Sequence, residues 1–230
     1  MDYDRQPPMP VARYREAQRV MPGVETLYTL VRATLESATP PGARLLLVGA
    51  GGGREVEALL PSDHGFRLMG VDPSADMLAL VPPHPGRLEL VQGLVEDLPS
   101  GPAFDGATAL LVMHFLPDDG AKLDFLRQIR RRLRPGAPLI LADVVVEDRA
   151  AFARLAPVFE RHAARVGVAP EIAPAAVPQL ARMAFEAGTM IPVRRQEALF
   201  AEAGFRLAAP VWRGLWYAAW WLEAPADAQD

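Results

Sequence analysis

Apolar positions along the chain fall into two kinds of segment, short continuous runs and stretches with helical spacing. The short runs are bounded by glycine, proline or charged residues and predict buried strands. These runs are 44–48, 67–71, 87–92, 106–113 and 138–146. Segments with apolar residues three and four positions apart lie between them and predict helices. The predicted helices are 54–60, 75–80 and 119–133. Because strands and helices alternate, the pattern predicts a parallel sheet with helices on both faces.

The two ends of the chain depart from this alternation. Residues 11–37 have helical spacing that is interrupted at Met21-Pro22-Gly23. Together with the polar start of the chain, this predicts an N-terminal helical arm or lid. Residues 147–203 are mainly helical, and two further strands follow at 206–213 and 215–223, joined tightly near Gly214. We expect these last two strands to form an antiparallel pair at an edge of the sheet.

Composition and charge exclude several classes of function. The chain has 230 residues, of which 50% are hydrophobic and 23% charged, as in a globular domain of ordinary size. It contains no cysteine, which excludes disulfides, thiolate metal sites and cysteine nucleophiles. No cluster of residues has metal-ligand spacing, so we expect no metal. The net charge of −4 argues against broad nucleic-acid binding and leaves only a local basic patch open.

The sequence also bears on location. No apolar run approaches the length of about 18 residues that a membrane span requires. The N-terminal sequence MDYDRQPPMP has neither the basic nor the apolar segment of a secretory signal. We therefore expect a cytoplasmic protein that does not enter a membrane.

The stretch LLLVGAGGGREVEALL carries the strongest local signal, because a strand runs through glycines into a helix. A dinucleotide-binding loop needs glycine where Arg54 stands, and a P-loop needs a Lys-Ser/Thr ending that is absent. The remaining pattern is Gly49-x-Gly51-x-Gly53, with Ala50 inside it. Glycines there let backbone N–H groups approach a ligand at the start of the next helix. The alternative is a tight turn that binds nothing.

Two further loops fall at the carboxyl ends of predicted strands, where open α/β sheets bind ligands. Asp72 ends the second strand and is followed by Pro73. A carboxylate at that point can accept both hydroxyls of a ribose, or it can cap the next helix. Leu94 and Val95 follow the third strand, where their side chains and backbone could sandwich an adenine ring.

The loop after the fourth strand contains the titratable group closest to the expected reaction centre. Met113 and His114 fall there, in the sequence MHFLPD. His114 is a candidate general base or acceptor-orienting group, and the alternative is a hydrogen-bonded loop histidine.

These motifs, in this order, resemble the class I S-adenosylmethionine (SAM)-dependent methyltransferases. The match spans roughly residues 44–223, through the glycine loop, VDPS, EDLP, HFLPD and LRPGAPLILAD. It implies an α/β fold with a Rossmann-like seven-stranded, mostly parallel sheet and an antiparallel last strand. It also implies an arm at 1–38, a SAM-binding domain at 39–230 and a helical insertion at 147–203. The residues that it places at the cofactor SAM are Gly49, Ala50, Gly51, Gly53, Asp72, Pro73, Leu94, Val95 and Met113.

A closer resemblance connects the chain with the carboxy-SAM synthases of tRNA wobble-uridine modification, which convert SAM and prephenate into carboxy-SAM. It rests on QRVMPG, on MHFLPDDGAKLDFLRQIRRRLRPGAPLILAD and on EALFAEAGF. Arg182 aligns with the family's arginine for the extra carboxylate. Four polar positions of that family differ, namely a tyrosine, two acids and an asparagine. The residues found there are Val24, Leu47, Leu94 and Leu110. These departures argue against carboxy-SAM synthesis and leave the contacts for ordinary SAM in place.

The sequence therefore predicts a SAM-dependent methyltransferase with a small organic acceptor. The arm and the insertion would recognise the acceptor, with Tyr14, Arg19 and Arg182 as candidate contacts. Packing of Tyr14 and Arg19 within the arm, and a solvent-exposed Arg182, are the alternatives. A carboxy-SAM synthase relative and a non-catalytic SAM-binding protein remain the competing functions.

Aromatic residues of the last two strands leave the oligomeric state open. They fit core and edge packing, an acceptor pocket, or a contact within a homodimer. These residues are Trp212, Trp216, Tyr217, Trp220 and Trp221.

Overall fold

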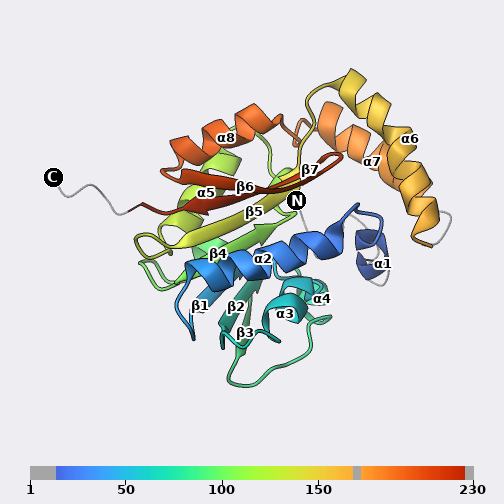
Figure 1. Ribbon diagram of the computed structural model, residues 1–230. Coiled ribbons are helices and arrows are strands. Elements are labelled where there is room, and N and C mark those ends of the chain that lie inside the picture. Colours follow the sequence, from blue (N-terminus) through green and yellow to red (C-terminus); the bar gives the residue numbers. More distant parts are fainter. Residues whose placement is uncertain (1–13, 168–171, 226–230) are drawn as a thin grey trace.

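A seven-stranded sheet with the order β3-β2-β1-β4-β5-β7-β6 forms the centre of the computed structural model, which describes residues 14–167 and 172–225 (Figure 1). Strands β1 to β5 run parallel, and β7 lies antiparallel between β5 and β6. The strands are β1 Arg44–Val48, β2 Arg67–Asp72, β3 Leu88–Gln92, β4 Gly106–Leu110, β5 Pro138–Val144, β6 Arg206–Gly214 and β7 Tyr217–Glu223. The predicted fold class is confirmed. The chain order reverses between β1 and β4, which is where such sheets open a crevice.

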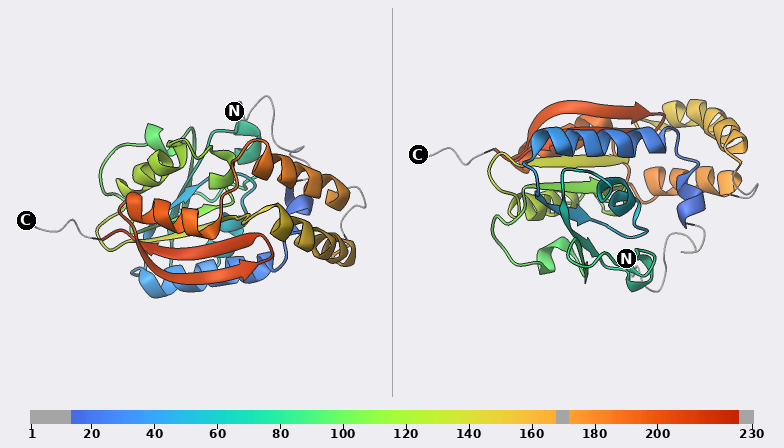
Figure 2. Two further views of the ribbon diagram at one scale, coloured as in Figure 1. Left: turned by 90° about the horizontal axis from the view of Figure 1, so that it is seen from above. Right: turned by 60° about the horizontal axis from the view of Figure 1, so that its bottom comes forward.

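Helices cover both faces of the sheet (Figures 1 and 2). Residues of α2, α3 and α6 pack on one face, and residues of α5 and α8 pack on the other. The helices are α1 Tyr14–Gln18, α2 Val24–Ala38, α3 Arg54–Leu59, α4 Ala75–Leu78, α5 Ala121–Arg130, α6 Arg149–Arg165, α7 Ile172–Phe185 and α8 Val193–Glu202. The apolar side chains that their spacing predicted face the sheet: Leu27, Val31 and Leu35 of α2 are all fully buried.

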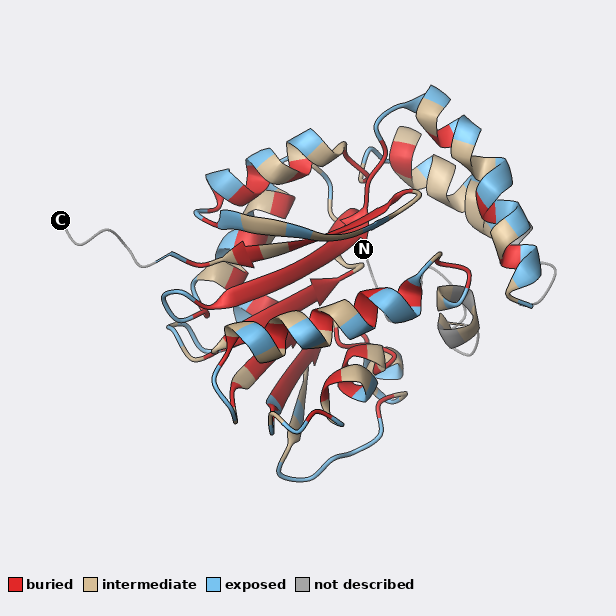
Figure 3. Cartoon of the chain, in the orientation of Figure 1, coloured by how far each residue is buried: buried red, intermediate tan, exposed pale blue. Residues whose placement is uncertain are grey.

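Burial is greatest in the middle strands and smallest at the β3 and β6 edges (Figure 3). Both β4 and β5 are buried along their whole length. This matches the near-continuous apolar runs that predicted them, because parallel strands covered on both faces need no polar alternation. The rigid centre of the sheet therefore fixes the positions of the loops at its carboxyl edge.

The predicted fourth strand is too long and is corrected here. It was expected to reach Met113, but β4 ends at Leu110. The N–H of Leu111 still donates to the Ala142 carbonyl, while Leu111 adopts a left-handed backbone with φ of 61° and turns the chain off the sheet. A short 3₁₀ helix, Met113–Phe115, follows. The predicted strand was too long because the residues of this turn are apolar, like those of the strand before it.

The predicted break at Met21-Pro22-Gly23 is present, since Gly23 has φ of 74° and α2 begins directly after it. Helix α2 packs on the sheet, whereas α1 lies beside the carboxyl edge (Figure 1). Residues 1–13 of the expected arm lie outside the described residues, and the division at residue 38 stays a prediction.

Helices α6 and α7 pack on each other and project beyond the carboxyl edge of the sheet (Figures 1 and 2). They occupy most of the insertion that was expected to be helical. Within the described ranges, no helix combines the length and the apolar character that crossing a membrane requires.

Candidate functional site

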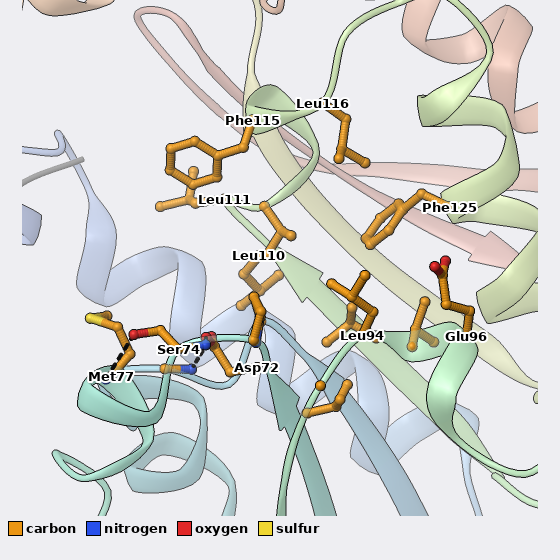
Figure 4. A pocket seen from close by; sticks show the side chains of 18 of the residues that line it. Asp72, Ser74, Met77, Leu94, Glu96, Leu110, Leu111, Phe115, Leu116 and Phe125 are labelled. Carbon is orange, nitrogen blue, oxygen red and sulfur yellow. Dashed lines mark hydrogen bonds between the residues drawn. The ribbon is translucent and has the colours of Figure 1, made fainter. Parts of the chain in front are cut away.

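A cavity of about 380 Å³ lies at the carboxyl ends of β1, β2 and β4 (Figure 4). Its wall is mostly apolar and includes residues from all four loops that the sequence singled out. Three carboxylates line it, Asp72, Glu96 and Asp124. Among the described lining residues there is no lysine or arginine. The cavity therefore suits an apolar ligand with positive charge better than a phosphate.

The backbone donors of the glycine loop bind within the protein. Each N–H group from residue 49 to residue 53 donates to an oxygen of this loop, of β2 or of α4. The bonds are Gly49 N to Val71 O (2.8 Å), Ala50 N to Val71 O (3.2 Å), Gly51 N to Asp72 Oδ2 (2.9 Å), Gly52 N to Met77 O (3.2 Å) and Gly53 N to Ala50 O (3.2 Å). A phosphate-binding loop keeps such donors for the ligand. This loop instead holds its own shape and brings bare backbone close to the cavity.

Two of the glycines are required by close contacts. A Cβ atom on Gly49 would lie 2.3 Å from Cγ2 of Val112, and φ of Gly49 is 76°. A Cβ atom on Gly51 would lie 2.7 Å from both Asp72 Oδ2 and the Cβ of Met77. Both residues line the cavity. Larger side chains would therefore push the loops of β1, β2 and β4 apart.

Asp72 joins the glycine loop to the loop after β2. Its Oδ2 accepts the Gly51 N–H and its Oδ1 accepts the Ser74 N–H, both at 2.9 Å. The side chain that caps α4 is that of Ser74, whose hydroxyl oxygen accepts the Met77 N–H at 3.3 Å. Pro73 also lines the cavity. The carboxylate is thus held at the cavity wall, where the predicted ribose contact requires it.

Leu94 lies across the cavity from Met77 (Figure 4), and Val95 also lines the cavity. Val95 is buried, while Leu94 is 44% exposed. Their loop is held to β2 because the Gly93 N–H donates to the Asp72 carbonyl at 3.0 Å. The predicted base-binding residues are therefore brought together with Asp72 in one wall.

The structure does not place the side chains of Met113 and His114 in the cavity wall. Met113 is 1% exposed and packs under α5. The residues of this segment that line the cavity are instead Leu111, Val112, Phe115 and Leu116. The turn at Leu111 and the 3₁₀ helix after it rotate the segment, so the direction of its side chains could not be read from strand alternation. The apolar character of LVMHFL was the only available signal for these lining residues.

His114 is buried and bound to Asp143, the residue before the last one of β5. Its Nδ1 lies 2.6 Å from Asp143 Oδ1, and its backbone N–H donates to the same oxygen at 3.2 Å. Gln196 Nε2 donates to Asp143 Oδ2 at 3.1 Å. A carboxylate at Nδ1 favours the tautomer that carries its proton there, which leaves Nε2 as a proton acceptor. The buried Lys122 ammonium, whose pKa is lowered by burial, donates to the Met113 carbonyl at 2.6 Å.

Tyr14 is the one acceptor-side candidate among the cavity-lining residues. Its ring lies against Gly52, where an added Cβ would come within 2.3 Å of Tyr14 Cε1. Gln18 Nε2 donates to the Tyr14 hydroxyl at 2.9 Å. Burial, followed by the charges of Glu55 and Asp72, raises the pKa of Tyr14, so the hydroxyl stays protonated.

The two candidate arginines lie away from the cavity wall. Arg19 is exposed and donates from Nη2 to the Val166 carbonyl at 3.2 Å, which connects α1 with the end of α6. Arg182 is exposed on α7. Of the three candidate acceptor contacts, Tyr14 therefore lines the cavity, and Arg19 and Arg182 do not.

A buried acid beneath the glycine loop was not foreseen. Glu55, in the first turn of α3, is 6% exposed and accepts a hydrogen bond from the Thr108 hydroxyl at 2.6 Å. Burial, together with the charge of Asp72, raises the pKa of Glu55 to about 8 against the opposing effect of the Thr108 bond. Glu55 stands four residues before the fully buried Leu59. Residues at this spacing lie on the same face of a helix, so the sequence could have indicated that Glu55 points into the protein.

Comparison with known proteins finds methyltransferases by family model and by sequence identity. Residues 46–139 match the family model described as a methyltransferase domain. A tRNA U34 carboxymethyltransferase of Pseudoalteromonas atlantica is 35% identical over 109 residues, which are 45% of this chain and 32% of that protein. The match thus spans about a third of the curated relative.

Solved structures share the fold. The Burkholderia thailandensis 1,6-didemethyltoxoflavin-N1-methyltransferase, with its substrate and S-adenosylhomocysteine (SAH) bound, superposes with a TM-score of 0.59 at 20% identity, covering 94% of this chain and 85% of that one. A methyltransferase in complex with the Haloferax volcanii Trm112 activator superposes with a TM-score of 0.61 at 16% identity, covering 94% and 96%.

Proposed function

We propose that this chain, which belongs to the class I SAM-dependent methyltransferase superfamily, transfers a methyl group from SAM to a small organic acceptor. The observation that supports this function best is the cavity at the β1–β4 switch point. It joins the glycine loop, Asp72 and the Leu94–Val95 loop in one apolar wall with three carboxylates. SAM carries a flat aromatic base, a ribose, a sulfonium and an amino-acid end with one ammonium and one carboxylate group. The apolar side chains suit the base, Asp72 suits the ribose, and the carboxylates suit the two positive groups.

The cofactor contacts follow from these matches. Asp72 would accept hydrogen bonds from the ribose hydroxyls, and Val95 and Leu111 would enclose the base. The glycine loop would approach the methionine part with its backbone, since its N–H groups are committed within the protein. Carboxylates without basic neighbours in the described wall favour a ligand with positive charge. When SAM is bound, its sulfonium supplies an activated methyl group.

The protein's own contribution to methyl transfer is alignment and exclusion of water. The apolar side chains of Val112 and Phe115 and the ring of Tyr14 form the part of the wall that would exclude water. His114 is proposed as a general base for a hydroxyl or a protonated amine, supported by the Asp143 contact that leaves Nε2 able to accept a proton.

Acceptor recognition is assigned to the arm and the insertion, whose helices α1, α6 and α7 lie at the cavity side of the sheet (Figure 1). Tyr14 would contact the acceptor directly. Arg19 and Arg182 would attract an acidic group on it from outside the cavity. We propose a cytoplasmic enzyme that acts on a small molecule in preference to a nucleic acid. A homodimer contact is proposed at the half-buried aromatics of the last hairpin, Trp212 and Trp221.

The second candidate function is a carboxy-SAM synthase-like reaction. It is favoured by the 35% identity to a tRNA U34 carboxymethyltransferase and by Arg182. It is disfavoured by the apolar Leu94 and Leu110 at positions that are polar in that family, and by the exposure of Arg182.

Calorimetric titration with SAH and mass spectrometry of the co-purifying ligand test these functions. We expect SAM or SAH to co-purify, and Asp72→Asn to weaken SAH binding by about 10- to 100-fold, the value of one or two hydrogen bonds to a charged group. Asp63→Asn, at an exposed position, is the matched control and should bind like the parent chain. Carboxy-SAM in the purified protein would favour the second candidate. Absence of SAH binding by the parent chain would exclude both.

A further inference from the structure

Glu55 is buried, and an ionised carboxyl group at a buried position loses its hydration at a large cost in free energy. It is buried at the start of α3, directly after the glycine loop, on the face of the sheet that α2 covers. Among the described residues, its side chain accepts one hydrogen bond, from Thr108, which is the β4 partner of Leu47 in the parallel register. Glu55 therefore places a carboxyl group beside the end of β1, where the strand itself carries the apolar Leu47. An isosteric apolar side chain would pack there without a desolvation cost.

The groups that face Glu55 do not neutralise it. Within residues 14–167 and 172–225, no lysine, arginine or histidine forms an ion pair with it. Asp72 at the end of β2 opposes its ionisation, and Tyr14 of α1 and Tyr28 of α2 interact with it electrostatically. Arg54, the next cation on α3, pairs with Glu25 and lies over the ring of Tyr28. The missing partner for an ionised Glu55 is a positive charge.

A ligand bound in the cavity can supply this positive charge. Asp72 and Tyr14, which both interact electrostatically with Glu55, line the cavity. Gly49 and Gly51 also line it, and their loop leads through Gly53 directly into the first turn of α3, which carries Glu55.

We propose that Glu55 senses the charge of the bound cofactor and, when ionised, strengthens the binding of SAM relative to SAH. This inference rests on the proposed function. SAM carries a sulfonium and SAH a neutral thioether, so the two ligands differ by one positive charge at the sulfur. A cation above the loop favours the Glu55 carboxylate, and loss of that cation on methyl transfer restores the proton. Binding of SAM therefore releases more protons than binding of SAH, and product dissociation is assisted.

The direct test counts protons. Titration calorimetry at about pH 7.5 in two buffers with different ionisation heats gives the number of protons released with each ligand. For the parent chain we expect SAM to release about half a proton more than it does from the Glu55→Gln variant, with a smaller difference for SAH. Comparing the same ligand on both proteins cancels the titration of the ligand's own amino group. Glu57→Gln, an exposed position on the same helix, is the matched control and should behave like the parent chain.

Affinities give a second measurement. Between about pH 6.5 and pH 9, the preference of the parent chain for SAM over SAH should rise about three- to tenfold more than that of Glu55→Gln, equivalent to a shift of up to one pKa unit. Equal proton counts and equal preferences in both proteins would overturn the inference and leave the proposed function intact. Failure of the parent chain to bind either ligand would overturn both.

Thr108→Val keeps the test decisive if Glu55→Gln does not fold. This change removes the bond that lowers the pKa of Glu55. The midpoint of the pH-dependent SAM preference should therefore move to higher pH. A merely structural Glu55 would lose stability in this variant without moving the midpoint, and an unmoved midpoint would contradict the inference.

Discussion

Each face of the sheet buries one carboxyl group beside the carboxyl edge, and the two groups have different surroundings. Asp143 on the α5–α8 face is fully buried and accepts from the His114 backbone N–H, from His114 Nδ1 and from Gln196 Nε2. Glu55 on the α2–α3 face accepts from one hydroxyl, and its pKa is raised to about 8. A buried carboxylate is stabilised by the donors aimed at it, so one with a single neutral donor holds its proton instead.

The difference separates a carboxyl group that is held by three hydrogen-bond donors from one that has a single donor. Asp143 fixes the turn after β4, including the backbone of His114, whatever the cavity contains. Glu55 lacks such donors and lies beside the cavity-lining residues Asp72 and Tyr14. Its charge can therefore follow what the cavity binds.

Removing the well-bonded acid should have the largest effect. Asp143→Ala leaves three buried donors without an acceptor, and we expect the free energy of unfolding to fall by at least about 4 kcal/mol. Urea denaturation at neutral pH measures it. Asp63→Ala, on an exposed loop, should change stability by less than about 0.5 kcal/mol. A loss at Asp143 as small as that of the control would contradict the comparison.

Glu55→Gln should change how stability depends on pH. The pKa of Glu55 is higher in the folded protein than its ordinary value of 4.5, so the folded state binds the proton more tightly. The associated stability is fully present below about pH 4.5 and is lost as the pH rises through about 8. From pH 6 to pH 9 the parent chain should lose roughly 3 kcal/mol more than Glu55→Gln. Parallel stability curves, measured by urea denaturation in matched buffers, would show that Glu55 has an ordinary pKa.

A smaller effect is expected at the glycine loop. Gly49→Ala and Gly136→Ala both place a side chain on a left-handed backbone, with φ of 76° and 81°. Only Gly49 also meets a neighbour, Val112, because no atom lies within 4 Å of a Cβ on Gly136. Gly49→Ala should cost about 1–2 kcal/mol more than Gly136→Ala in urea denaturation, and it should weaken SAH binding. Equal losses in the two variants would show that the β1 loop is loosely packed.

The smallest stability effect is expected for a carboxyl group added where water reaches it. Leu94 is 44% exposed at the cavity wall, so Leu94→Asp should change stability by less than about 0.5 kcal/mol. An acid there could accept the amino group of an adenine, and SAH affinity measured by calorimetry should rise by up to about tenfold. Weaker SAH binding would mean that the base lies elsewhere.

The fold was predictable because it follows from apolar patterning. The strand at Arg44–Val48 has the expected bounds, since a charged residue precedes the run and Gly49 ends it. The end of β4 was wrong because Leu111 adopts its left-handed conformation inside an apolar run, and no residue type marks it. The turn after β4 brings Val112 and Phe115 to the cavity wall, while the side chain of Met113 is buried. The placement of Met113 at the cofactor stays a prediction.

The candidate site was predictable in its loops and less so in its side chains. Gly49, Gly51 and Asp72 gather as expected because the topology forces strand ends together. The His114–Asp143 contact joins residues 29 positions apart, and the Glu55–Thr108 contact joins residues 53 apart. Single-sequence spacing carries no information about such pairs, since each depends on how helices dock on the sheet. The ligand roles of these residues stay predictions.

The position of β7 between β5 and β6 has a consequence for how the chain folds. β5 is buried along its whole length, yet the strand that pairs with its outer edge, Tyr217–Glu223, comes more than 70 positions later in the chain. Until that strand is synthesised, β5 presents an apolar edge with unpaired backbone groups, which is the kind of edge that recruits other chains. The β6–β7 hairpin therefore closes the sheet only after the whole segment that follows β5 has been made, and the nascent chain is most prone to aggregation just before β7 emerges.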